Sequence, residues 1–86
     1  MLDKTVSVTV ETMDQTKRAD VSLSPHTEVG EILRLGRQNW KLPGDVDYTL
    51  VNLRTGQQLA PNRTLAQQGV EEGDRLVIQP ILHAGV

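Results

Sequence analysis

Three short segments in the last third of the chain carry most of the information about its fold: Asn62-Arg63-Thr64-Leu65, Gly69-Val70-Glu71-Glu72-Gly73-Asp74 and Arg75-Leu76-Val77-Ile78. The first predicts a single helical turn over residues 64–68, with Leu65 as its buried anchor. The second predicts a bend at Gly73-Asp74. The third predicts a final strand that buries Leu76 and Ile78 while Val77 and Gln79 face outward. Pro80 is expected to end its regular pairing, because proline has no N–H to donate.

The N-terminal third alternates between apolar and polar side chains, as a half-buried strand does. The alternation runs over residues 6–11, breaks at residues 13–16 and resumes over residues 19–23. Two such runs separated by a short turn predict an antiparallel hairpin. The apolar positions are Val6, Val8, Val10, Ala19, Val21 and Leu23.

The next segment has the period of an amphipathic helix that begins near Glu28. Thr27 or Ser24 is expected to cap its first turn through a hydroxyl. Gly36 is expected to permit a close approach to a strand, since glycine has no Cβ. The apolar stripe consists of Val29, Ile32, Leu33, Gly36 and Trp40, and Trp40 is expected to cover the core.

Two further strands are predicted, over residues 48–53 and 57–59, joined by a turn at residues 54–56. The whole order is strand, strand, helix, strand, short strand, helical turn, strand. This order predicts an α+β roll in which one helix packs on a mixed sheet. We expect one domain over residues 1–80 and a flexible tail over residues 81–86.

Composition excludes several classes of function. The 86 residues include no cysteine, which excludes disulfides and thiolate nucleophiles. A net charge of −2 without a basic cluster argues against nucleic acid as a partner. No apolar run approaches the roughly 20 residues that a membrane helix needs. We therefore expect a cytoplasmic protein that does not bind membranes.

The order of elements, with Leu59, Asn62-Arg63-Thr64-Leu65 and Gly73-Asp74-Arg75-Leu76, resembles ubiquitin and its bacterial YukD-like relatives. The resemblance covers roughly residues 5–85 and implies the ubiquitin-like β-grasp fold. The phrases in the body of the chain are more similar to the YukD-like branch. The fold alone does not define a role, since β-grasp domains serve many.

The tail resembles that of ubiquitin in its register. With Leu76 and Ile78 set on the apolar residues of ubiquitin's last strand, Ala84-Gly85 falls on the terminal Gly-Gly and Val86 becomes a one-residue extension. The resemblance implies a bacterial protein modifier that is processed after Gly85 and joined to target proteins by an isopeptide bond. The implied partners are an E1-like activating enzyme, an E2-like conjugating enzyme and a JAB-type peptidase. Ile81 and His83 replace basic residues of ubiquitin's tail.

The alternative is a non-conjugated YukD-like adaptor or scaffold in a complex such as a type VII secretion apparatus. This hypothesis needs only the folded surface. The resemblance places Val51 at the centre of ubiquitin's recognition patch, with Val77 beside it, and both are expected to be exposed. The expected partner-binding surface is Val51, Val77, Ile81 and Leu82.

The sequence predicts no enzyme activity, metal or cofactor. His26 and His83 are the only histidines, and neither lies in a zinc-binding spacing. Asp20, Ser22 and Ser24 are close to His26 in sequence, but adjacent residues of a strand point to opposite faces. The acidic set Glu71, Glu72 and Asp74 does not match a calcium loop and is expected to be a solvated turn.

Overall fold

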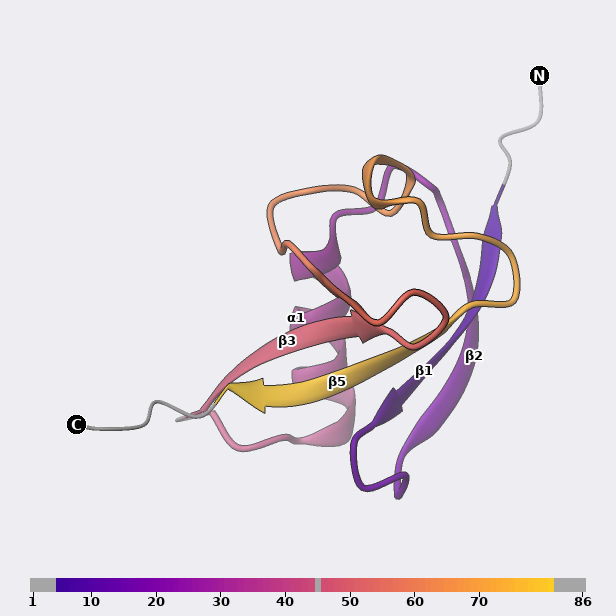
Figure 1. The fold of residues 1–86 in the computed structure, drawn as a ribbon. Coiled ribbons are helices and arrows are strands. Elements are labelled where there is room, and N and C mark those ends of the chain that lie inside the picture. Colours follow the sequence, from indigo (N-terminus) through magenta and orange to yellow (C-terminus); the bar gives the residue numbers. More distant parts are fainter. Residues whose placement is uncertain (1–4, 45, 82–86) are drawn as a thin grey trace.

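The computed structural model describes residues 5–44 and 46–81. A five-stranded sheet is crossed on one face by the single α-helix, and the connection between the last two strands arches over one end of the sheet (Figure 1). No helix in this described part is long and apolar enough to cross a membrane. The elements are β1 (Val6–Thr12), β2 (Arg18–Leu23), α1 (Val29–Trp40), β3 (Asp47–Asn52), β4 (Gln57–Leu59), the 3-10 helix η1 (Ala66–Gln68) and β5 (Arg75–Ile81).

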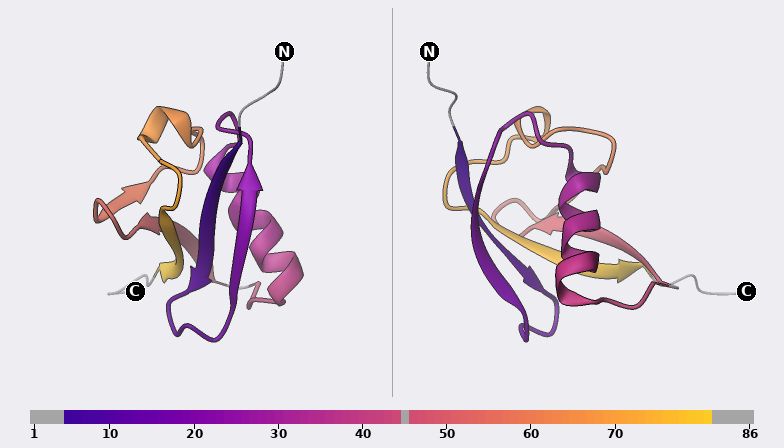
Figure 2. Two further views of the ribbon diagram at one scale, coloured as in Figure 1. Left: turned by 90° about the vertical axis from the view of Figure 1, so that its right-hand side faces the viewer. Right: turned by 180° about the vertical axis from the view of Figure 1, so that it is seen from behind.

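The sheet is mixed, with the strand order β2-β1-β5-β3-β4. The first and last strands run parallel at its centre, and the other neighbours are antiparallel. The views in Figure 2 show α1 packed across the face that the strands turn inward. This topology confirms the predicted α+β roll with one helix on a mixed sheet.

The core lies between α1 and the inner face of the sheet, and the predicted alternation explains its composition. The register places Val10 beside Leu76, and Leu50 beside both Ile78 and Leu59. Leu65 is fully buried, which confirms its predicted role as the anchor of the helical turn over residues 64–68, the turn that contains η1. The buried cluster is Val8, Val10, Val29, Ile32, Leu33, Leu50, Leu59, Leu65, Val70, Leu76 and Ile78, and Trp40 packs against it.

The start of α1 differs from the prediction. Glu28 is the residue before the first helical turn, and no side chain caps that turn. Ser24 instead accepts a hydrogen bond from the His26 N–H, so the prediction of a hydroxyl cap is wrong. The first N–H groups of the helix are satisfied by the backbone of a distant loop, since Val29 and Gly30 donate to carbonyls of residues 63 and 61. Such a long-range cap leaves no local sequence signal.

The middle and end of α1 depend on backbone geometry. A Cβ on Gly36 would lie 2.8 Å from Ile78 Cδ1, so the predicted close approach to a strand is confirmed. The helix ends because Lys41 takes the left-handed conformation, with φ of 52°. Its N–H and that of Leu42 both donate to the Arg37 carbonyl.

Pro80 does not end the last strand, as the sequence predicted, because β5 continues to Ile81 and Pro80 pairs with Tyr48. Leu53 donates to the Arg75 carbonyl, which makes every second pair between β3 and β5 a hydrogen-bonded one. Pro80 falls in a pair without such bonds, so its nitrogen faces away from β3. Pairing of β1 with β5 has already ended at Ile78, so no acceptor there needs a proline N–H.

Ile81 therefore belongs to the sheet, where it pairs with Asp47, and not to the tail in which the sequence placed it. The expected tail residues Leu82, Ala84, Gly85 and Val86 lie outside the described residues, as does His83.

Candidate functional site

The sheet face opposite α1 carries the two valines that were predicted to bind a partner. We call this surface the open face and define its centre by Val51, Val77 and Leu53. Val51 and Val77 are direct neighbours on adjacent strands, and Glu11 lies on the other side of Val77. Leu53 directly follows the end of β3, and its N–H still donates to the Arg75 carbonyl, so the strand alternation continues and directs Leu53 to the same face as Val51.

The exposure of these side chains differs from the prediction. Val77 is only 6 % exposed, because it lies on the central strand between Glu11 and Val51, and Val51 is half-buried. The prediction of two exposed valines is therefore wrong for Val77. Leu53 is the large exposed apolar residue of this surface, at 47 %. Its spacing from Val51 is visible in the sequence, which predicts Leu53 only as the last residue of a strand.

The positively charged side chain of Arg75 lies beside this apolar centre and is oriented by an ion pair. Arg75 Nη2 donates to Glu11 Oε1 at 2.7 Å, and the Glu11 side chain is 4 % exposed. The Arg75 side chain remains 49 % exposed, and its backbone carbonyl accepts the Leu53 N–H at 2.9 Å. The open face thus combines an exposed leucine with a guanidinium that an ion pair orients, and arginine is enriched at protein interfaces.

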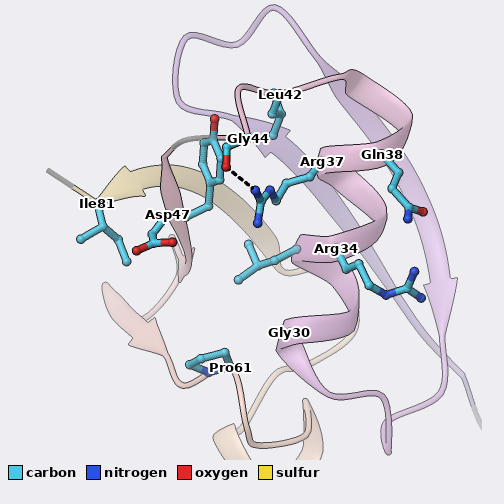
Figure 3. Close-up of a pocket in the computed structure, with 11 residues that line it drawn as sticks. Gly30, Arg34, Arg37, Gln38, Leu42, Gly44, Asp47, Pro61 and Ile81 are labelled. Carbon is cyan, nitrogen blue, oxygen red and sulfur yellow. Dashed lines mark hydrogen bonds between the residues drawn. The ribbon is translucent and has the colours of Figure 1, made fainter.

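A hollow lies between α1 and the start of β3, apart from the centre of the open face, and Figure 3 shows its lining. We call it the α1–β3 groove. Arg34 and Arg37 project from the helix, while Asp47 and Ile81 lie on the opposite wall (Figure 3). Its volume is about 690 Å³. Ile81, which is 36 % exposed, is the one described residue of the predicted partner-binding surface that lies here and not at the centre of the open face.

The walls of the α1–β3 groove are tied together by Arg37 and Tyr48. Arg37 Nη2 donates to the Gly44 carbonyl at 3.0 Å, and its guanidinium lies 5.8 Å from the centre of the Tyr48 ring. The Tyr48 hydroxyl donates to the Pro43 carbonyl at 3.1 Å. Arg34 is paired with Glu31 on its own helix. Both arginines are thus engaged within the protein, and the contacts of Arg37 fix the connection from α1 to β3.

A buried carboxylate holds the bend before β5. Asp74 is 4 % exposed and accepts hydrogen bonds from the side chains of Asn52 and Arg54 and from the Glu71 N–H, at 2.7 to 3.2 Å. Hydrogen bonding by Arg54 is the main cause that lowers the Asp74 pKa, against the opposing effect of burial. The prediction of a solvated acidic turn is wrong for Asp74, although Glu71 and Glu72 are exposed.

The residues considered for catalysis do not form a site. Asp20 accepts a hydrogen bond from Thr9, and Ser22 pairs with Ser7, so both side chains are engaged with β1. Among residues 5–44 and 46–81, no group of three or more His, Cys, Asp or Glu side chains is placed to hold a metal ion. In the same residues, every buried side-chain nitrogen and oxygen has a hydrogen-bond partner.

Comparisons with known proteins agree with this architecture. Residues 5–78 match the family described as "WXG100 protein secretion system (Wss), protein YukD". The match runs from the start of β1 to the middle of β5 and so spans nearly the whole folded domain. No curated protein sequence matches the chain.

Solved structures share the fold at low sequence identity. A ubiquitin from Caldiarchaeum subterraneum is 22 % identical, with a TM-score of 0.75, over 94 % of this chain and 99 % of that one. The UBL domain of Plasmodium falciparum Dsk2 is 16 % identical, with a TM-score of 0.71, over 90 % of this chain and 99 % of that one. These similarities establish the ubiquitin-like β-grasp fold, as the resemblance predicted.

Proposed function

Because the chain belongs to the YukD family of the WXG100 protein secretion system, we propose that it is a non-enzymatic interaction module of such a system. The main observation in support of this proposal is that the family match covers residues 5–78, which is nearly the whole folded domain. In this proposal the protein works in the cytoplasm of a bacterium and binds a component of the secretion machinery through its folded surface.

We assign the binding role to the open face. Leu53 is exposed there beside the half-buried Val51, and the buried Glu11 carboxylate holds Arg75 next to them. An exposed leucine is ordinary by itself, but a partner that covers it would also reach the Arg75 guanidinium that Glu11 orients. Desolvating that charge costs free energy unless it is paired, so the partner should place a carboxylate or carbonyl acceptor beside the apolar residue that covers Leu53.

The experiment compares two aspartate substitutions at exposed apolar residues in the native host. Leu53→Asp is expected to abolish co-purification of secretion components with the tagged full-length protein and to stop export of a WXG100 protein. Met13→Asp is the matched control, because Met13 is 57 % exposed but lies in the turn between β1 and β2. Both variants should keep the melting temperature of the wild type. Normal export with Leu53→Asp would refute the role of the open face.

A second candidate is a protein modifier attached to targets through the Gly85 carboxylate. It is supported by the ubiquitin-like register of Ala84-Gly85 in the sequence. A JAB-type peptidase would remove Val86. An E1-like activating enzyme would then adenylate Gly85, and transfer through an E2-like conjugating enzyme would form an amide with a lysine of the target.

The two candidates differ in what they require of the tail. Deletion of residues 82–86 leaves export intact if the folded surface alone is used, and abolishes function if Gly85 is conjugated. The deletion starts at residue 82 because Ile81 is paired in the sheet. For the modifier, the protein from the host should lack Val86 by intact mass, and higher-mass adducts should vanish in Gly85→Arg without a change in melting temperature. Unattached, full-length protein alone would refute conjugation.

A further inference from the structure

Strand β2 is an outer strand of the sheet, with β1 on one side only. The Thr12 N–H donates to the Lys17 carbonyl, which sets the alternation of the β1–β2 ladder. Residues 19, 21 and 23 therefore direct their backbone groups to β1. The N–H and C=O groups of Arg18, Asp20 and Ser22 point to the other side, where the described structure has no strand. The edge thus offers three residues with unpaired backbone groups.

The side chains of this edge do not shield it. Asp20 Oδ1 accepts from Thr9 Oγ1 at 2.7 Å, and the hydroxyls of Ser22 and Ser7 lie 3.0 Å apart. Both bonds draw the β2 side chains back over the sheet toward β1. Natural sheets commonly protect an outer strand with charged side chains, proline, a bulge or an overlying segment, and of these β2 carries the charges of Arg18 and Asp20. β2 contains no proline, and its register with β1 is continuous over all six residues.

An apolar hollow runs beside the same edge, on the helix side. We call it the α1–β2 groove, and its volume is about 150 Å³. Figure 2 (left) shows α1 alongside β2, the strand farthest from β4 in the sheet order. Leu35 is 39 % exposed at this place, and Asn39 is the one polar side chain of the lining. The lining is Val10, Ala19, Val21, Leu23, Ile32, Leu35, Gly36, Asn39 and Trp40.

Charge distinguishes one end of the edge. Lys17 directly precedes β2 and Arg18 is its first residue. Neither side chain lies within ion-pair distance of a carboxylate in the part of the chain that the structure describes. A second copy of this chain is a poor occupant. Antiparallel pairing of two β2 strands through residues 18, 20 and 22 would set Asp20 directly opposite Asp20, and like charges in that position are destabilising.

We propose that β2 accepts an extended segment of a partner protein as a sixth strand, with acidic residues beside Lys17 and Arg18 and alternate apolar side chains in the α1–β2 groove. Backbone hydrogen bonds to residues 18, 20 and 22 supply affinity, and the groove and the two cations select the sequence. This inference rests on the proposed function only in that the chain is an interaction module.

The direct test is an NMR titration of the ¹⁵N-labelled full chain with acetylated, amidated peptides. The acidic probes are EEVTVTV and VTVTVEE, because the direction of the added strand decides which end meets Lys17. One of them is expected to shift the amides of Arg18, Asp20 and Ser22 and to slow their hydrogen exchange. The probes KKVTVTV and VTVTVKK should bind at least about tenfold more weakly, since they bring like charges to the basic end.

Matched variants separate the backbone from the side chain. Asp20→Pro removes the outward N–H and should weaken binding by about fivefold or more, whereas Asp20→Ala removes the same carboxylate and keeps the N–H. Leu35→Asp should weaken binding by about tenfold, while Leu53→Asp, on the open face, should leave it unchanged. A cooperative thermal unfolding transition verifies that each variant is folded.

Three outcomes would overturn the proposal. They are no binding of either acidic peptide up to about 1 mM, shifts confined to the open face, and protection of the β2 amides by self-association in sedimentation experiments. None of them bears on the secretion assay, because Leu53→Asp reports on a different surface. A negative result for peptide binding at β2 can therefore be distinguished from a negative result for the proposed function in secretion.

Discussion

Removal of the buried Asp74 carboxylate should destabilise the protein. Asp74 accepts hydrogen bonds from Asn52 Nδ2 at 2.9 Å and from the Glu71 N–H at 2.8 Å, and Asn52 is fully buried. In Asp74→Ala both donors lose this acceptor. Water cannot replace it at the Asn52 amide without opening the core.

The magnitude follows from these two donors. An orphaned buried amide costs about 1–3 kcal/mol, and loss of an ordinary hydrogen bond costs about 0.5–1.5 kcal/mol. Arg54 adds little, because its side chain is 44 % exposed and its ion pair is screened by solvent. The deleted carboxylate was itself desolvated, which offsets part of the loss. We therefore expect the free energy of unfolding to fall by about 2 kcal/mol, and the melting temperature by roughly 8–16 °C.

The assay is urea unfolding followed by fluorescence of Trp40, the single tryptophan. The midpoint should fall while the slope with denaturant stays constant. Glu71→Ala is the control, since this exposed side chain only approaches Arg54, at 4.0 Å, and should change stability by less than about 0.5 kcal/mol. A loss in Asp74→Ala no greater than that of the control would refute the assigned role of the buried carboxylate.

The lowered Asp74 pKa also predicts how the stabilisation by this carboxylate depends on pH. The pKa is lowered in the folded protein, mainly by the Arg54 hydrogen bond, so folding favours the ionised carboxylate. The stabilisation is therefore complete above the pKa of the unfolded chain and is lost as pH falls through the lower folded value. The difference between wild type and Asp74→Ala should shrink in acid. A difference that grows in acid would contradict the direction of this pKa shift.

Three further substitutions test local features of the fold. The pKa of Asp14 is lowered from 3.8 to about 2 by hydrogen bonds, chiefly from the Thr12 hydroxyl, so the stability difference between wild type and Asp14→Ala should be constant above about pH 5 and vanish toward pH 2. Pro80→Ala should change the urea midpoint little, because the position needs no N–H, and a loss above about 1 kcal/mol would show that this pairing register is wrong. Gly36→Ala should stabilise an Ile78→Val background by about 1 kcal/mol through helix propensity. It should not stabilise the wild type, where the new Cβ meets Ile78 Cδ1; equal effects in both backgrounds would exclude that contact.

The predictions from sequence succeeded where a feature is periodic and local. Strand alternation identified β1 and β2, and the apolar stripe identified α1 together with the close approach of Gly36. They failed where the hydrogen bonding of one segment depends on a second segment that is distant in the chain. The cap of α1 comes from carbonyls of residues 61 and 63, and Pro80 continues β5 because β1 has ended beside it.

The candidate site was less predictable for the same reason. The outward direction of Val77 follows from alternation, but its burial depends on Glu11 and Val51, which reach it only through the sheet register. Asp74 reads as part of an acidic surface turn, and its burial appears only when Asn52 is brought to the same end of the sheet. The free edge of β2 also requires the strand order, since a hairpin in sequence does not show which of its strands is outermost.

The positions of these surfaces allow more than one partner. The centre of the open face lies on β5 and β3, whereas the proposed docking edge is β2, and β1 separates β2 from β5. Three strand spacings separate β2 from β3, about 14 Å. A segment added at β2 enters the plane of the sheet on the side away from Leu53, while a partner on the open face approaches from above that plane. Occupation of one surface therefore does not require release from the other, so a domain of this size can join two proteins, as an adaptor must.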